Sequence, residues 1–264
     1  MTISKIIKEL ELYFPRTISE SWDNVGLLIG NDEEKVKKIQ ITLDVTEECI
    51  NEAIKNDANL IIAHHPIIFT SVKEITNKTS LGRKILKLIE NNIAVYVLHT
   101  NIDAAKDGLN DYLGKVLDLK NGKILETSSE NNKVISSESG IGRIYKLKEE
   151  IEASTFLEKI KSNLKLDKLK VSGNISKKIK KIAIINGAGS SYWKKAKFKG
   201  CDLCITGDVR YHEALDAKEE DIIIVDIGHY ESEIFFIDII YEKLKIYSEV
   251  DVCIYKGQPL FKYL

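Results

Sequence analysis

The chain has 264 residues, of which 44% are hydrophobic, so it can bury a large core. Its 39 basic and 40 acidic side chains give a formal net charge of −1, which provides no electrostatic basis for binding nucleic acid or an anionic membrane. Four scattered cysteines are too few for a disulfide framework, and no apolar run reaches the roughly 18 residues of a membrane span. We therefore expect a cytoplasmic protein without a membrane segment.

The N-terminal region predicts a helix followed by a turn. Between Met1 and Phe14, apolar residues recur at helical spacing with Lys and Glu between them, whereas a signal peptide would need an uninterrupted apolar core. In the segment Ser21–Gly30, small polar residues interrupt the apolar ones. We therefore expect Asp23 to lie in a plain turn.

Two strands are predicted next, and both end in residues that can carry chemistry. The first, Lys38–Val45, alternates in polarity and ends at Asp44. The second, Leu60–Ala63, runs directly into His64, His65 and Pro66. Proline offers no ladder donor and breaks the strand, so both imidazoles can turn toward one cavity, where they are good ligands for divalent metals. The alternative is a pair of solvated loop histidines.

A third predicted strand, Ile93–Leu98, follows a helix that starts at Thr79 or Ser80, and it leads into His99 and Asp103. The alternation of strand and helix predicts a parallel sheet with right-handed crossovers. In such a sheet all strands end at one edge, which is where open α/β proteins bind ligands. This edge is therefore expected to gather Asp44, His64, His65, His99 and Asp103.

The remaining chain is predicted to repeat this organisation. Residues 121–180 resemble a connecting segment of a strand or two and one helix without chemistry. Three further strands are expected at Ile182–Ile185, Cys201–Thr206 and Asp221–Val225, each followed by a polar loop and a helix. The expected organisation is thus an N-terminal lobe at 1–120, a connecting segment and a C-terminal lobe at 181–264, with the two similar α/β lobes facing one shared metal-binding cleft.

His229 and Glu233 follow the last of these strands at spacing i, i+4, which places both side chains on one face of a helix start. Taken alone, this spacing is more often a chance occurrence on a surface helix. However, all five histidines of the chain fall at predicted strand ends or helix starts. This distribution favours a metal site.

Two other features are weaker. Cys201 and Cys204 fall inside a predicted strand, where they are expected to be core residues and not a redox pair. The turn Gly187–Ser190 matches no nucleotide-binding motif, but together with Arg210 it is a candidate contact for an anionic group.

Several motifs together resemble one known family. Trp22–Leu27 (WDNVGL), Ala63–Pro66 (AHHP), His99–Ala104 (HTNIDA), Thr206–His212 (TGDVRYH) and Gly228–Glu233 occur in order across both ends of the chain. They resemble the Nif-three-like dinuclear metal-centre family, also called GTP cyclohydrolase I type 2. The resemblance implies a three-layer α/β fold with two related lobes and mostly parallel sheets, a hexameric ring, and the metal ligands His64, His65, Asp103, His229 and Glu233.

Five ligands for two divalent ions require one shared group, which must be a carboxylate because a neutral imidazole cannot bridge. Mixed imidazole and carboxylate ligation suits Zn, Fe or Mn. Water between two such ions becomes a nucleophile, so a metal-dependent hydrolase acting on a nucleotide-like or small phosphorylated substrate is expected. His99 and His212 are candidates for proton transfer or for supporting the ligands. The alternative is a non-catalytic metal-binding scaffold or partner-binding oligomer.

Overall fold

The computed structural model describes residues 1–130, 133–134 and 138–261. The chain forms two compact units, one from Met1–Ile102 with Phe236–Leu264 and the other from Asp103–Phe235. This division differs from the predicted boundaries at residues 120 and 180. The C-terminal strand pairs with the first unit's sheet, and the expected connecting segment supplies strands to the second unit's sheet. Residues 131–132 and 135–137 of that segment lie outside the described chain.

The first unit is built on a five-stranded sheet with the order β1-β4-β3-β2-β13. Its strands are β1 (Gly26–Ile29), β2 (Lys38–Thr42), β3 (Leu60–Ala63), β4 (Ala94–Val97) and β13 (Asp251–Tyr255). All pairings are parallel except that of β1 with β4. The mostly parallel sheet predicted from strand–helix alternation is therefore present.

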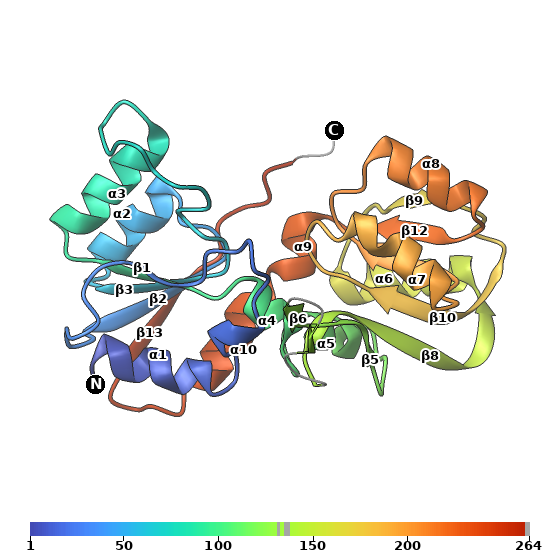
Figure 1. Ribbon diagram of the computed structural model, residues 1–264, viewed down its shortest axis with the longest axis horizontal. Helices are drawn as coiled ribbons and strands as arrows, with labels where there is room; N and C mark the ends of the chain where they lie inside the picture. Colours follow the sequence, from blue (N-terminus) through green and yellow to red (C-terminus); the bar gives the residue numbers. More distant parts are fainter. Residues whose placement is uncertain (131–132, 135–137, 262–264) are drawn as a thin grey trace. The chain divides into compact units, whose positions relative to one another are not determined.

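Helices cover both faces of this sheet (Figure 1). The crossover helices α2 (Glu47–Lys55) and α3 (Ser80–Glu90) pack on one face, on a core that includes Ile61 and Val95. Successive strand side chains point to opposite faces, so Ile62 and Tyr96 face the other layer. That layer consists of α1 (Ile3–Glu11) and α10 (Phe236–Leu244). Thr46 and Thr79 begin α2 and α3 by accepting hydrogen bonds from Cys49 N and Gly82 N.

The second unit contains a six-stranded sheet with the order β5-β8-β10-β11-β12-β9. Its strands are β5 (Lys123–Thr127), β8 (Gly140–Glu152), β9 (Lys170–Ser172), β10 (Lys178–Ile184), β11 (Leu203–Thr206) and β12 (Ile223–Asp226). Only β10, β11 and β12 pair in parallel, so the parallel arrangement is confined to the centre of this sheet. A short pair, β6 (Ser129–Glu130) and β7 (Lys133–Val134), stands apart from it.

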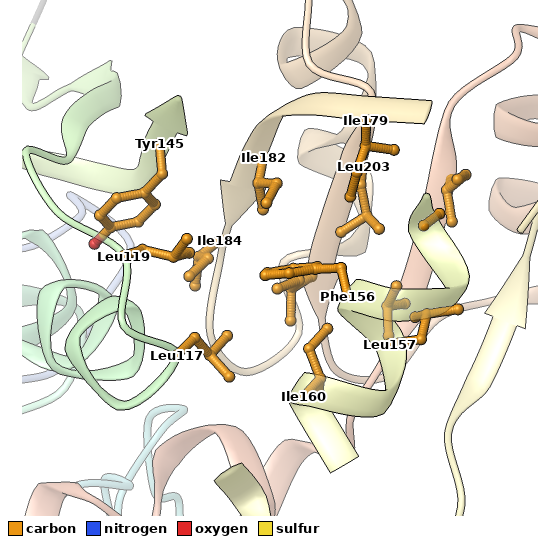
Figure 2. Close-up of a cluster of buried hydrophobic side chains, with 14 of the residues drawn as sticks. Leu117, Leu119, Tyr145, Phe156, Leu157, Ile160, Ile179, Ile182, Ile184 and Leu203 are labelled. Atoms are coloured by element: carbon orange, nitrogen blue, oxygen red, sulfur yellow. The ribbon is translucent and has the colours of Figure 1, made fainter. Parts of the chain in front are cut away.

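Two layers of helices enclose this second sheet. Leu117 directly follows α5 (Leu109–Val116). It packs with Phe156 and Ile160 of α6 (Ala153–Leu164) and with strand residues in one buried cluster (Figure 2). The crossover helices are α7 (Trp193–Phe198) and α8 (Tyr211–Glu219). Helix α7 connects β10 to β11 and α8 connects β11 to β12, and both connections run in the same direction across the sheet. Right-handed crossovers of this kind lie on one face of the sheet, so α7 and α8 belong to the same layer.

Each unit therefore has a strand–helix–strand–helix–strand centre, which confirms the predicted α/β class. The short helices α4 (Thr100–Ala104) and α9 (His229–Glu233) follow the third strand of each centre. Cys201 and Cys204 are buried as expected, and burial raises the pKa of the Cys201 thiol to about 11. Among the described residues, no helix is long and apolar enough to cross a bilayer.

Candidate metal centre

Three histidines of the first unit form one cluster. His64 and His65 follow β3, and His99 follows β4, the neighbouring parallel strand. One ligand atom from each lies within 4.8 Å of those of the other two. The ring centroids of His64 are 4.9 Å from those of His65 and 5.1 Å from those of His99. The strand ends thus bring together the histidines that the sequence placed at one sheet edge.

Hydrogen bonds orient each of these rings. The Nδ1 atom of His64 lies 2.8 Å from the Leu98 carbonyl oxygen, and the Nδ1 atom of His65 lies 2.8 Å from Asp44 Oδ1. Carbonyl and carboxylate oxygens only accept, so both Nδ1 atoms carry the proton and donate it. The lone pair of each ring is then on Nε2, which is the arrangement that orients a metal-binding imidazole.

Asp23 orients the ring of His99. Sequence reasoning did not predict this contact. The prediction placed Asp23 in a plain turn, but its buried carboxylate accepts from His99 Nδ1 at 2.8 Å and from Thr100 N at 3.0 Å. Burial raises the pKa of Asp23, but the hydrogen bonds from His99 and Thr100 outweigh it and lower the pKa below its ordinary value. Asp23 and His99 are 76 positions apart in the sequence, so no local spacing could have revealed this pair.

The second unit holds the predicted pair on α9. His229 Nε2 lies 2.9 Å from Glu233 Oε2, so the i, i+4 spacing does bring the two side chains together. His229 Nδ1 donates to Asp208 Oδ2 at 2.7 Å, as in the first unit's histidines. Asp208 follows β11 with a φ of 51°, in the left-handed region that Asp tolerates better than most residues. Asp208 was not singled out from the sequence.

Asn186, at the end of β10, joins Glu233 to Asp103. Its Nδ2 donates to Asp103 Oδ1 at 2.8 Å and is 3.2 Å from Glu233 Oε1. The backbone N of Asn186 in turn donates to Asn110 Oδ1. One amide therefore gathers the two carboxylates predicted as ligands, and together they offer concentrated negative charge for a cation.

Gly187 lies against the same carboxylate. Its φ is 59°, and a Cβ at this position would lie 2.1 Å from Glu233 Oε1. The position therefore requires glycine, both for its backbone and for the space that Glu233 occupies. Gly187 N donates to Ser232 Oγ at 2.9 Å, so this amide is engaged within the protein and does not support the expected anion contact.

His212 lies elsewhere in the second unit. It is exposed near the start of α8, where its ring meets Tyr211 edge-on at 5.4 Å. In the described parts of the chain, no grouping of candidate metal ligands includes His212. Arg210 immediately before α8 is also exposed.

The donor chemistry of the two units fits a divalent transition metal. Four imidazoles have their Nδ1 protons directed to oxygen acceptors, and two carboxylates are held by a shared amide. Nitrogen and oxygen ligands of this kind suit Zn, Fe and Mn, and the combination does not select among them.

Comparison with known proteins identifies the family. The model of the family described as Duf34/NIF3 (NGG1p interacting factor 3) matches residues 1–259. The chain belongs to the Duf34/NIF3 family. This confirms the resemblance inferred from the motifs.

Curated members of the Duf34/NIF3 family are close in sequence and length. A protein of Clostridium perfringens named "GTP cyclohydrolase 1 type 2 homolog" is 42% identical over 252 residues, covering 96% of this chain and 94% of its own. A protein of the same name from Clostridium acetobutylicum is 39% identical, with 88% and 85% covered. The crystal structure of Staphylococcus aureus protein SA1388 has a TM-score of 0.89 and 30% identity, covering 100% and 99% of the two chains.

Proposed function

We propose that the protein is a dinuclear metal-dependent hydrolase that acts on a nucleotide-like or small phosphorylated substrate. Its ligands would be His64, His65, Asp103, His229 and Glu233. The observation that carries the proposal is the common orientation of the histidines, whose Nδ1 atoms donate to fixed oxygens, so that Nε2 is the ring nitrogen left for a metal. Surface histidines need no such arrangement. The names of the Clostridium relatives favour a nucleotide substrate.

The proposal that these ligands serve one centre rests on chain continuity. Asp103 directly follows Ile102, where the chain passes from the first unit to the second. The chain returns to the first unit at Phe236, and Glu233 lies three residues before it. The Cα atoms of Glu233 and Phe236 are therefore at most about 11 Å apart. Within the first unit, the ring of Phe236 lies 5.2 Å from that of His64. This continuity of the chain supports the proposal that both carboxylates serve the same centre as the histidines. The predicted cleft between the lobes stays a prediction.

A carboxylate shared between the two ions would allow five ligands to provide three contacts to each of them. Glu233 is the stronger candidate, because one of its oxygens faces His229 and the other faces Asn186, which also holds Asp103. Its two oxygens thus point toward different neighbours, as a bridging carboxylate requires. Asp103 is the alternative.

Divalent ions bound by these ligands would supply a water nucleophile near neutral pH and polarise the group under attack. The protein's own contribution is to position groups and to move protons. His99 is the candidate proton-transfer group, since its Nε2 can accept a proton while the Asp23 carboxylate holds Nδ1–H and stabilises the imidazolium. For His212, a role in proton transfer stays a prediction.

The test is a turnover screen of purified protein, metal-loaded and metal-free, against nucleotides and phosphoesters. Metal-dependent turnover that His99→Ala reduces by about a hundredfold or more would support the hydrolase, because general acid–base groups contribute this much. His212→Ala is the comparison for the second candidate. Full metal loading without turnover of any substrate would instead favour the non-catalytic scaffold.

A further inference from the structure

Two exposed aromatic rings border the histidine cluster of the first unit. Trp22 is 58% exposed and Phe69 is 54% exposed. Their ring centroids are 5.9 Å apart, and Trp22 also meets the His99 ring edge-on at 6.3 Å. Adjacent exposed aromatic rings at the edge of a polar cluster are typical of surfaces that bind a partner or a ligand.

The loops that carry the two rings are fixed in position. Asn24 Nδ2 donates to the Ile68 carbonyl oxygen at 2.6 Å, which ties the segment that carries Trp22 to the segment that carries Phe69. On the other side of Trp22, Glu20 N donates to Thr100 Oγ1 at 2.9 Å. The rings therefore project from segments held on the same framework as His99. Such preorganisation lowers the entropy cost of binding a ligand.

We infer that Trp22 and Phe69 form a subsite that stacks a planar heteroaromatic base of the substrate. The inference rests on the proposed function and adds the class of group that is recognised. The two ring planes are inclined at 57°, so the rings do not cover one another face to face. A nucleobase is a flat π system that stacks on such faces whatever its hydrogen-bonding edges. A base bound there would lie beside His99, whose ring is 5.1 Å from that of His64 and 5.8 Å from that of His65, the proposed ligands of the same unit.

The chain offers a direct optical test, because it contains only two tryptophans. The other one, Trp193, is 4% exposed in α7 of the second unit, so a dissolved nucleotide does not reach it. Metal-loaded Trp193→Phe protein would be titrated with guanosine 5′-monophosphate and, separately, with ribose 5-phosphate, while Trp22 fluorescence is recorded. We expect saturable quenching by the nucleotide and binding at least about tenfold weaker for the sugar phosphate, which lacks the base.

Calorimetry then compares variants on the same protein. Trp22→Ala and Phe69→Ala should each weaken nucleotide binding by about tenfold, and Trp22→Phe should restore part of it. Phe198→Ala is the matched control, since Phe198 is 90% exposed at the end of α7, and it should bind as the parent does. Circular dichroism and metal content, measured for each variant, show that the fold and the ions are retained.

The outcomes separate the subsite from the proposed reaction. Equal affinity for the nucleotide and the sugar phosphate, or unchanged nucleotide affinity in both alanine variants, overturns the stacking subsite even if phosphoesters are hydrolysed. Base-dependent binding that is lost in the alanine variants supports the subsite. If such binding occurs without turnover of any substrate, the proposed hydrolase function is contradicted and the subsite is retained.

Discussion

Glu233 contacts two neighbours through its two carboxylate oxygens, namely His229 and Asn186, and it occupies the space that a Cβ at Gly187 would need. Glu233→Gln keeps the size of the side chain and removes its charge. We expect at least one ion to be lost and activity to fall, because less negative charge would then compensate two cations. Elemental analysis after identical loading measures this.

Glu231→Gln is the matched control for that variant. Glu231 lies two residues after His229 on the same helix, so it projects from a different side and should keep both ions. If both variants lose metal equally, or neither does, helical spacing from His229 did not identify the ligand.

Gly187→Ala tests the close packing around the same carboxylate. The added methyl group would overlap Glu233 Oε1 and must displace it, in addition to about 1–2 kcal/mol of strain from a left-handed backbone. The metal content and the thermal unfolding temperature should both decrease. Gly200→Ala provides the comparison, because Gly200 has a φ of 75° but no atom within 4 Å of its Cβ position. Gly200→Ala should lower the unfolding temperature through backbone strain and leave the metal content unchanged. If Gly200→Ala lost as much metal as Gly187→Ala, the packing argument would be contradicted.

Among the secondary-structure elements, the turn before β1 is fastened to the start of α4. Asp23 Oδ2 accepts from both the backbone N and the hydroxyl of Thr100, the first residue of that helix. An acceptor at this position satisfies an N–H that has no partner within the helix. Asp23 therefore has two roles, since it also orients His99.

Asp23→Asn should destabilise the metal-free protein at pH 7 by about 1–3 kcal/mol, the typical cost of weakening a buried charged hydrogen bond. The lowered pKa of Asp23 determines how this changes with pH. The ionised carboxylate stabilises the fold above the unfolded-state pKa of about 3.9, and this contribution is lost as the pH falls through the lower folded-state pKa.

The difference between the parent and Asp23→Asn in urea unfolding should therefore shrink between pH 5 and pH 3, a window set by the approximate unfolded-state pKa. Asp32→Asn, on an exposed loop position, is the control and should change stability little at either pH. A difference that stays constant down to the lowest pH would show that the carboxylate charge is not involved.

For the complete chain, we expect about two transition-metal ions per polypeptide after full reconstitution, because five ligands exceed the four of a typical single site. Elemental analysis against protein concentration gives the ratio. A value near one would rule out the dinuclear arrangement and leave a single site in one of the units. The chelated protein should regain both ions on reloading, and the stoichiometry should be the same for Zn and Mn.

The quaternary prediction is a hexamer, and it follows from the family resemblance alone. Light scattering at micromolar concentration should report a mass near six times the 29.9 kDa of one chain. A monomer under these conditions would remove the hexamer. The measurement should be repeated after chelation, since ions that hold an assembly together would change its mass when removed.

Several contacts at the candidate site could be predicted from short stretches of sequence. Apolar runs ending in His64 and His65 predicted the strand end, and the four-residue interval placed His229 beside Glu233. Strand and helix periodicity fix such relations because they involve only neighbouring residues. The alternation of strands and helices also indicated parallel centres, which both units contain.

Other features depended on the folded chain. The pairing of β13 with β2 returns the C-terminus to the first unit, and the bond from Asp23 to His99 and the amide of Asn186 between Asp103 and Glu233 each join distant segments. The residue types in these segments also suit turns and exposed loops, so they do not specify their partners. Long-range pairs form only when the packing of the whole core outweighs the entropy of closing long loops, and that balance belongs to the tertiary structure.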